Sequence, residues 1–354
     1  MQCDSRVDIL RKGVKIGEVF CTSLLVKFNK NSDVCRAMQA DLSEDNMVMS
    51  KEYSGIGQAP KSYTFQKFTD RLRPVLIVDG REYFLGTFMA MATPEKLSDT
   101  GSMYRLEAYD ETMILKQAAF TQRTLVSAGT PYITAIQTLL TACGFTSILT
   151  TANTATVTDD IEYAPGVKYL TAVNELLDGI NYEHVHVDHA GNVILRPVQQ
   201  RYTADHVYND RKNRLIQPPI ERTEDIYSLP NVISAVVSLP QNQTPLVSIK
   251  ENHNAESELS IERRGYRVVK VYKLNNIADQ QTLDDYVNAR FTEASQVTET
   301  VQINTPPEGD HEYGDTVQID TDLVSGLYVE MEWEISFSTT ACSMRHRLER
   351  KVFA

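Results

Sequence analysis

Two short helices followed by a hairpin, predicted between Thr130 and Gln199, constrain the fold more than any other stretch. Apolar residues fall three or four positions apart twice, each time before a glycine: Ile133, Ile136, Leu140 and Cys143 before Gly144, then Val167, Leu170, Val173 and Leu177 before Gly179. This spacing places apolar side chains on one helix face, and glycine readily adopts the left-handed conformation that ends a helix. The pattern therefore predicts two amphipathic helices.

The ends of this stretch are also marked in the sequence. Thr130 is a residue type that caps helices, and Pro131 fits the first helical position, where its missing N–H is not needed. After the second helix, Tyr182–Asp188 and Val193–Val198 flank a glycine-containing turn, which predicts a hairpin. We expect a compact α+β insert here, with β-rich sequence on both sides.

The N-terminal part of the chain is typical of an antiparallel meander. It opens with a hairpin that turns at Gly13 and contains a second hairpin around Asp79-Gly80. The expected strands are Arg6–Lys12, Ile16–Phe28, Val34–Leu42, Arg73–Val78, Glu82–Ala92 and Met103–Tyr109, followed by a connector, Asp110–Leu125, with a short helix. Residues 43–70 are polar with little periodicity, and we interpret them as an extended arm or, alternatively, a poorly marked strand pair.

Beyond the insert, Arg201–Pro219 is polar and contains two adjacent prolines, which indicates a linker. The strands expected after it are Asn231–Leu239, Leu246–Glu251, Tyr266–Tyr272, Glu299–Ile303, Thr316–Ile319, Gly326–Phe337 and Cys342–Phe353, with a turn region at Pro306–Tyr313. A helix is predicted from Asp279 to about Gln296, because Leu283, Val287 and Phe291 share one face.

Two distant segments, 86–107 and 326–349, resemble each other. In each, a glycine starts a strand of alternating apolar residues, and a later strand returns to end in Leu-Glu. This similarity indicates a duplicated domain. The sequence thus predicts an α+β, predominantly β protein: a first β-barrel-like domain in 1–125, the α+β insert in 126–200, and a second β-barrel-like domain with one helix in 201–354.

Composition excludes several classes of function. The 354 residues include 35 Lys and Arg against 47 Asp and Glu, a net charge of −12, so the basic face that nucleic-acid binding requires is not expected. No apolar run approaches the roughly 18 residues of a membrane-spanning helix, so we expect no membrane insertion. The five cysteines, Cys3, Cys21, Cys35, Cys143 and Cys342, are scattered, and we expect reduced thiols in a protein folded in a cytosol.

One stretch has the residue types of a metal site. His184, His186 and Asp188 would share a strand face, with His189 beside them, as in a two-histidine, one-carboxylate site. The stretch runs directly into a turn, however, and a solvated polar strand face is the simpler interpretation. We predict no metal ligand here.

Signatures of catalysis or cofactor binding are not found in the sequence. There is no GxSxG or HExxH motif, and carboxylate pairs such as Glu107 with Asp110, or Asp159 with Asp160, are too common to stand out. Trp333 shares a strand face with apolar neighbours, so we expect it in the core or, alternatively, at a subunit contact. We predict no catalytic and no cofactor-binding residues, and no enzyme activity.

Three stretches in a fixed order carry a resemblance to a known family. They are the opening VDILRKGVKIGE with the hairpin RLRPVLIVDGREYFLGTF, the insert with its helix LTAVNELLDG and hairpin, and the ending YGDTVQID, GLYVEMEWEISF and MRHRLERK. In these features the chain resembles the late control protein D family, the baseplate or tail hub proteins of contractile-tailed phages and phage-tail-like particles.

The resemblance implies a structural homotrimer in which each chain carries two related barrel domains. Six similar domains would then meet the hexameric rings of the tail tube, above a threefold spike. The implied partners are the tail tube protein, the spike and other baseplate proteins, and the implied location is the virion tail or baseplate, assembled in the host bacterial cytoplasm. A negative chain also suits a channel through which a polyanion passes.

Two other functions are left open by the residues. One is a cell-wall-degrading tail hydrolase that uses scattered carboxylates, and the other is a monomeric receptor- or carbohydrate-binding module at the tail tip. The last expected strand lies close to Ala354, so we expect any cell-wall hydrolysis to belong to a partner.

Overall fold

The computed structural model describes residues 2–43, 66, 69–92, 95–98, 101–198, 201–209, 216–224, 226–227, 229–237, 246–274, 280–294 and 296–353. The chain forms two compact units, Met1–Pro219 with Ile303–Arg347, and Ile220–Gln302 with Leu348–Ala354. The division into domains at residues 125 and 200 stays a prediction. Most of the predicted arm, residues 43–70, lies outside the described residues.

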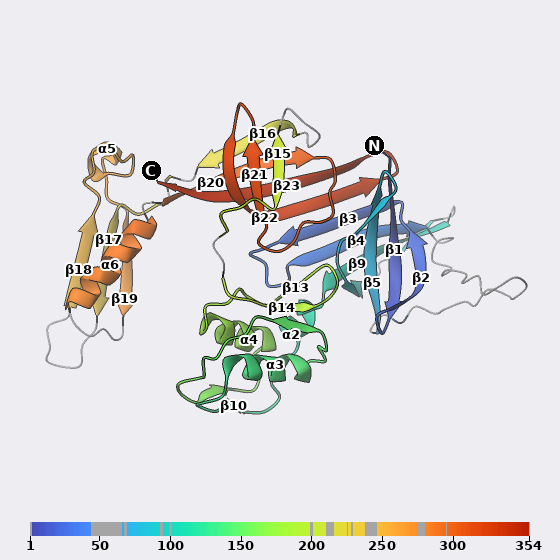
Figure 1. Cartoon of the computed structure of the whole chain (residues 1–354), viewed down its shortest axis with the longest axis horizontal. Helices are drawn as coiled ribbons and strands as arrows, with labels where there is room; N and C mark the ends of the chain where they lie inside the picture. Colours follow the sequence, from blue (N-terminus) through green and yellow to red (C-terminus); the bar gives the residue numbers. More distant parts are fainter. Residues whose placement is uncertain are drawn as a thin grey trace, which may run out of the picture. The chain divides into compact units, whose positions relative to one another are not determined.

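A large antiparallel sheet dominates the first unit (Figure 1). Its strands are β1 (Cys3–Arg11), β2 (Val14–Phe20), β3 (Ser23–Asn29), β4 (Arg36–Ser43), β5 (Asp70–Val78), β7 (Phe88–Ala92), β9 (Gly101–Asp110), β22 (Ser325–Ser338) and β23 (Cys342–Phe353), with β6 (Arg81–Phe84) beside β5, β8 (Glu95–Ser98) beside β9 and β21 (Thr316–Asp320) beside β22. The order is β23-β22-β3-β4-β9-β7-β5-β1-β2, so the first and last parts of the chain share one sheet.

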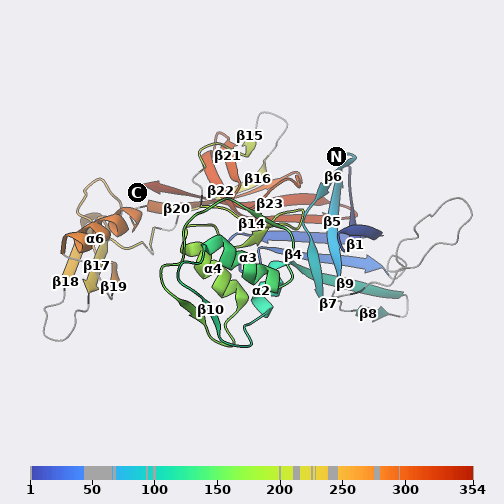
Figure 2. The same cartoon turned by 60° about the horizontal axis from the view of Figure 1, so that its bottom comes forward.

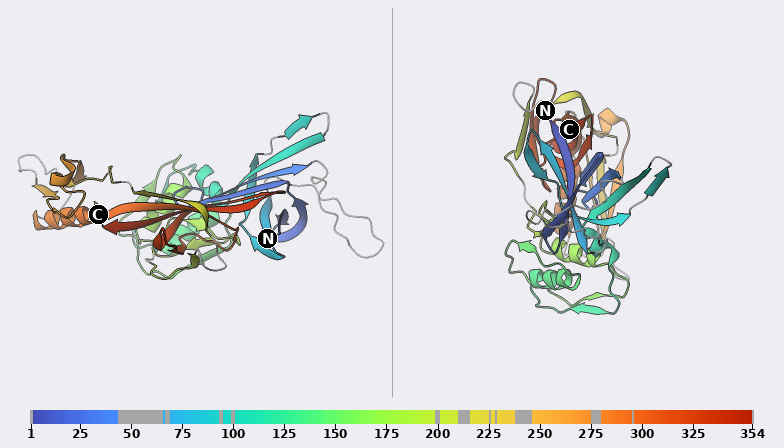
Figure 3. Two further views of the ribbon diagram at one scale, coloured as in Figure 1. Left: turned by 90° about the horizontal axis from the view of Figure 1, so that it is seen from above. Right: turned by 90° about the vertical axis from the view of Figure 1, so that its right-hand side faces the viewer.

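This sheet is strongly twisted, and its core lies inside the twist. Figure 1 shows β1, β2 and β5 running across the direction of β3, β4 and β22, and the two views in Figure 3 show the same bend. Inward-facing residues such as Val26, Phe28, Trp333 and Ile335 are buried, and Val26 pairs with Ile335 across β3 and β22. The predominantly β, α+β class is therefore confirmed, and Trp333 is a core residue. No closed barrel forms among the described strands.

The predicted strand Ile16–Phe28 is wrong as one element. The chain turns at Cys21 and Thr22, where Cys21 N–H bonds to the Ser5 carbonyl and Thr22 N–H bonds to the Asp41 carbonyl. Before this point β2 pairs with β1, and after it β3 pairs with β4 and β22. A change of pairing partner leaves no mark in the alternation of apolar residues, so the sequence showed one long strand.

The insert packs as its own layer within the first unit, with α2, α3 and α4 grouped together (Figure 2). Its elements are α2 (Thr112–Gln117), β10 (Thr124–Val126), α3 (Tyr132–Ala142), β11 (Ile148–Thr150), β12 (Ile161–Tyr163), α4 (Tyr169–Asp178), β13 (His186–Val187) and β14 (Val193–Leu195). Ile136, Leu140, Val173 and Leu177, predicted from the helical spacing, are fully buried in its core. Gly144, just past α3, has a φ of 93°, as a helix-ending glycine requires.

Two details of the insert were predicted wrongly. Pro131 is the residue before α3 instead of its first residue, and no side chain caps that helix. The regular hairpin strands are shorter than Tyr182–Asp188 and Val193–Val198. The first is interrupted where the Val185 amide donates to the Asn174 side chain, 3.0 Å away, and pairing resumes where the Glu183 N–H bonds to the Arg196 carbonyl.

The second unit is a small sheet covered by a helix. Its elements are β16 (Gln217–Glu224), β17 (Val232–Val237), β18 (Leu246–Glu251), α5 (Ile261–Arg264), β19 (Val269–Leu274), α6 (Gln280–Ala294) and β20 (Gln296–Thr305), of which β16 and β20 are shared with the first unit. Ile233, Ala235 and Val237 of β17 pack against Leu283 and Val287 of α6, which confirms the helix predicted from Asp279 to Gln296. The buried Glu299 is paired with both Arg222 and Arg350.

The predicted linker Arg201–Pro219 is in fact partly strand. It contains β15 (His206–Asn209), which runs parallel to β21, and the start of β16. Nearly all side chains of β16 are exposed. Its residues are therefore mostly polar, and the sequence does not show the alternation of apolar residues that marks a half-buried strand. Among the described helices, none is long and apolar enough to span a membrane.

Candidate functional site

The loop between β20 and β21, residues 306–315, connects distant parts of the first unit, and we call it the junction loop. The sequence predicted only a turn here. Most of its residues are buried or half-buried, and Asp310 is exposed. Gly309 lies so close to β6 that a Cβ atom there would be 2.3 Å from Cβ of Tyr83. The loop is therefore packed into the unit, and its polar side chains need partners inside it.

Glu312 of the junction loop joins the N-terminal sheet to the insert. One carboxylate oxygen accepts from Nη2 of Arg36 on β4, and the other accepts from the ring and from the backbone N–H of His189, the latter at 3.0 Å. The Arg36 side chain is only 2% exposed. Burial opposes ionisation of Glu312, but the hydrogen bonds from His189 and the charge of Arg36 lower the pKa of Glu312 to about 2.

Arg36 is held in an unusual environment for a guanidinium. The guanidinium group lies over the Trp333 ring, with its central carbon 5.9 Å from the ring centroid. Its Nε and Nη1 atoms are buried without a hydrogen-bond partner among the described residues. Glu312 is thus its charge partner, and a buried cation that loses such a partner is strongly destabilising.

Tyr313, the next residue of the loop, packs between the sheet and the insert. Its ring stacks on His186 of β13 at 3.9 Å between centroids, and meets Phe28 of β3 edge-on. Its carbonyl accepts from Nη2 of Arg196 at 2.6 Å. Burial lowers the pKa of His186 to about 4, so this imidazole is neutral at physiological pH.

A second polar cluster, the histidine network, lies on the other side of the loop. Glu330 of β22 is completely buried and accepts from Nδ1 of His311 at 2.7 Å and from Nδ1 of His346 at 2.6 Å. The other ring nitrogen of His311 meets the Tyr208 hydroxyl at 2.9 Å, and that of His346 meets the Thr305 hydroxyl at 2.8 Å. Every ring nitrogen and both carboxylate oxygens in this network have a partner.

The pKa values of the three buried groups indicate which of them are charged. Burial by itself would raise the pKa of Glu330, but the charge of His311 and the bonds from both histidines lower it to about 2. Burial also works against charge on His311, yet the Glu330 carboxylate raises the pKa of His311 overall, whereas burial lowers the pKa of His346. We infer an ion pair of Glu330 with His311, and a neutral His346.

His206 of β15 extends this cluster toward the surface. It bonds to Asp315 at 3.1 Å, and its ring stacks on His311 at 3.7 Å between centroids and 11° between planes. Potential ligand atoms of His206, Glu308, Asp310 and His311 lie within 4.8 Å of one another. An imidazole binds a metal through an in-plane lone pair, so two nearly parallel stacked rings do not suit one shared ion. The arrangement is that of a hydrogen-bonded network.

The structure separates the histidines that the sequence grouped as a conceivable metal site. His186 is buried against Tyr313, and His189 is bonded to Glu312. His184 is exposed and bonds to Asp178, while Asp188 accepts from backbone and side-chain N–H groups of its own turn. Each has a structural partner, so this stretch offers no common ligand geometry.

The carboxylates considered for hydrolysis are also bound in structural roles. Asp110 is buried and accepts from the Arg36 backbone N–H at 2.6 Å and from Thr112. Asp160 accepts from the Ala128 N–H at 2.8 Å. Both carboxylates are thus engaged by backbone N–H groups of the fold.

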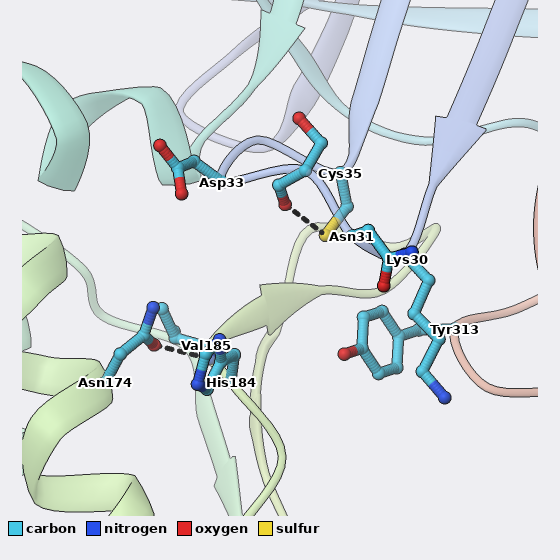
Figure 4. Close-up of a pocket in the computed structure, with 9 residues that line it drawn as sticks. Lys30, Asn31, Asp33, Cys35, Asn174, His184, Val185 and Tyr313 are labelled. Carbon is cyan, nitrogen blue, oxygen red and sulfur yellow. Dashed lines mark hydrogen bonds between the residues drawn. The ribbon is translucent and has the colours of Figure 1, made fainter. Parts of the chain in front are cut away.

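A cavity of about 250 Å³ lies beside Tyr313 (Figure 4). It is lined by the turn after β3, by Asn174 of α4, and by His184 and Val185. Burial raises the pKa of Cys35 to about 12, so that side chain is a thiol and not the nucleophilic thiolate. The cavity thus borders the same junction of sheet, insert and loop.

Comparison with known proteins identifies the fold. The sequence matches no protein-family model and no curated protein. The structure is similar to the tail protein from Neisseria meningitidis MC58 (TM-score 0.67, 11% identity, 98% of this chain and 97% of that chain). It is also similar to the 43 kDa tail protein of prophage MuSo2 from Shewanella oneidensis (TM-score 0.66, 7% identity, 98% of each chain).

A third similar structure is a chain of the Francisella PdpA–VgrG complex, with a TM-score of 0.59 and 8% identity, over 99% of this chain and 58% of that chain. At these identities the similarity establishes the fold. The chain has the fold of phage tail proteins, which confirms at that level the resemblance seen in the sequence.

Replacing Glu312 tests the junction. We expect Glu312→Ala to lower the free energy of unfolding by roughly 3 to 5 kcal/mol, because it leaves the Arg36 charge buried and unpaired. The matched control is Glu162→Ala, which removes an ion pair with Arg123 whose side chains are 41% and 76% exposed, and we expect it to lose at most about 1 kcal/mol. Urea denaturation measures both, and equal small losses would contradict the role given to Glu312.

Replacing His186 tests the pH dependence. His186 is neutral when folded and has an ordinary pKa when unfolded, so its stabilisation is complete above about pH 6.5 and is lost as the pH falls toward 4. We expect His186→Phe, which keeps the ring stack, to lose about 3 kcal/mol less stability than the wild type between pH 7 and pH 4. His184→Phe, at an exposed position, is the control, and parallel curves for all three proteins would refute the assignment.

Proposed function

We propose that this protein is a structural component of the tail of a contractile phage or phage-tail-like particle, and that it acts there as a trimeric hub joining the tail tube to the spike and baseplate. The observation that carries the proposal is the match over nearly the full length of both chains with two tail proteins. A match over nearly all of both chains supports a similar role for the whole chain, and not only one shared domain.

The chemistry of the buried polar groups supports a structural role. Glu312, Glu330 and the histidines around them have their hydrogen-bonding atoms committed to each other and to the backbone. Such networks hold a single arrangement of segments, because a partly satisfied one would be costly. This is what a part that transmits load between neighbours needs.

The similarity between segments 86–107 and 326–349 supports the symmetry-adaptor role. In each segment a glycine with positive φ, Gly86 at 134° and Gly326 at 153°, stands at or near the start of the first strand of a neighbouring pair, β7 with β9 and β22 with β23. Two related halves per chain, in a trimer, would present six similar surfaces to a hexameric tube.

Exposed apolar side chains supply surfaces for such assembly. In the second unit, α6 covers one face of the β18-β17-β19 sheet, and the other face carries Val247, Ile249, Val269 and Val271, each 46–60% exposed. Contiguous exposed apolar side chains are typical of contact surfaces.

The mass in solution tests the proposal. We expect gel filtration with light scattering to show a species of three 39.9 kDa chains, alone or after addition of tail tube and spike proteins, and electron microscopy to show rings. A strict monomer under all these conditions would contradict the hub. Release of fragments from purified peptidoglycan would instead favour the hydrolase, and glycan binding by the monomer would favour the tail-tip module.

A further inference from the structure

Two thiols lie on strands that are far apart in the order of the large sheet. Cys3 begins β1 and Cys342 begins β23, and six strands lie between β1 and β23 in the order of the sheet. The twist nevertheless brings β1 against β22, the strand next to β23. We call this place, where β1 meets β22, the seam. Cys3 and Cys342 both pack there against the same core cluster, and the Cys3 side chain acts on the Cys342 thiol as a hydrogen-bonding neighbour. No strand pairing between described residues joins the sheet here.

Both cysteines are fixed by their surroundings. Cys3 pairs with Val78, and the preceding residue, Gln2, exchanges hydrogen bonds with Asp79 at 2.7 and 2.8 Å. Cys342 directly follows the turn between β22 and β23, which is closed by a bond of 2.8 Å from the Ser338 N–H to the Ala341 carbonyl. Both side chains pack against the main core. The two cysteines are thus each held in place by bonds of their own, independent elements.

The remaining thiols do not share this arrangement. Cys21 and Cys35 are buried, at 8% and 7% exposure, whereas Cys3 and Cys342 are only partly buried and so accessible to a small oxidant. Cys143 is partly buried as well, but it belongs to the insert, at the end of α3. It provides a matched internal control.

We propose that Cys3 and Cys342 form a disulfide when the protein meets a low-molecular-weight disulfide such as oxidised glutathione, and that this bond closes the seam of the sheet. The bond would be absent in a reducing cytosol and would form after release of the particle, a timing that rests on the proposed function. The protein would be assembled with an open seam and then locked covalently.

The reaction is an ordinary thiol–disulfide exchange. The Cys3 thiolate attacks one sulfur of oxidised glutathione and releases one glutathione thiolate. Cys342 then loses its proton to solvent and attacks the Cys3 sulfur, which releases the second glutathione. Two protein thiols are oxidised and one glutathione disulfide is reduced to two thiols, so atoms and electrons balance.

The second step, the attack of Cys342 on the mixed disulfide, limits the rate of cross-linking. In the free protein, burial and then the neighbouring Cys3 raise the pKa of Cys342 to about 12. Burial still acts once Cys3 is in the mixed disulfide, so little of Cys342 is thiolate at neutral pH. The thiolate fraction of such a thiol rises about 30-fold from pH 7 to pH 8.5, and the cross-link should form faster by about the same factor.

The experiment treats the full chain with oxidised glutathione, without denaturant, and then blocks free thiols. We expect the number of free thiols to fall from five to three, the mass to fall by ~2 Da without a glutathione adduct, and peptide mapping to join residues 3 and 342 within one chain. The urea midpoint should rise and return to its starting value on reduction.

Variants separate the possible outcomes. Cys143→Ser should behave as wild type, whereas Cys342→Ser should stop at a stable glutathione adduct on Cys3. A stable adduct on Cys3 in the wild type, five unreacted thiols, or links only between chains would each overturn the proposal. The number of chains per particle is measured separately, on reduced protein. Failure of the cross-link therefore does not contradict the proposed hub. A monomer that forms the cross-link would contradict only the hub.

Discussion

The structure of the first unit depends on a carboxylate shared between two donors that the sequence places far apart. Glu312 accepts from Arg36, 276 positions before it, and from His189, 123 positions before it. A guanidinium with 2% exposure requires a negative partner, since an unpaired buried charge is far more costly than any single apolar contact is favourable. The N-terminal sheet, the insert and the junction loop must therefore meet at one place. The stacking of Tyr313 on His186 and the packing of Gly309 on Tyr83 follow from that meeting.

The histidine network shows how the same loop is fixed on its other side. An isolated carboxylate as buried as Glu330 would take up a proton, but two imidazoles donate to it and one of them carries charge. The second ring nitrogen of each histidine is hydrogen-bonded to a hydroxyl group, that of Tyr208 or that of Thr305. Polar atoms arranged in this way hold a geometry and leave no unshared group to react. The residues of this network therefore hold segments of the fold together.

Much of the fold could be predicted because local patterns decide it. The stripes through Ile136, Leu140, Val173 and Leu177 describe helices with one buried face, and the helix α6 and strand β18 match their predicted bounds closely. Partner choice could not be predicted in this way. Nothing in Ile16–Phe28 marks where pairing changes from β1 to β22, and β16 is too exposed to show alternation.

The candidate site was largely invisible in the sequence for a related reason. By simple strand alternation Glu330 would share a face with Glu332 and Glu334, whose side chains are partly exposed. Glu330 is nevertheless fully buried, because His311 and His346 donate to it. Those histidines are isolated in the sequence, and their common partner appears only once β22, β23 and the junction loop are brought together. The one signal available was a loop with two glycines among several charged residues and a tyrosine, a composition also typical of an exposed turn.

The pairing of β3 with β22 has a consequence for the synthesis of the chain. The Asn29 side chain bonds to Glu332, 303 residues later, so β3 must wait for most of the chain to leave the ribosome before its second neighbour exists. Until then one edge of β3, with Leu24, Val26 and Phe28 on its apolar face, is an unpaired template for any other strand nearby. Loop closure over such a distance is slow. We therefore expect a chaperone that covers strand edges to bind the nascent chain. We expect a prematurely terminated chain, which lacks β22, to aggregate.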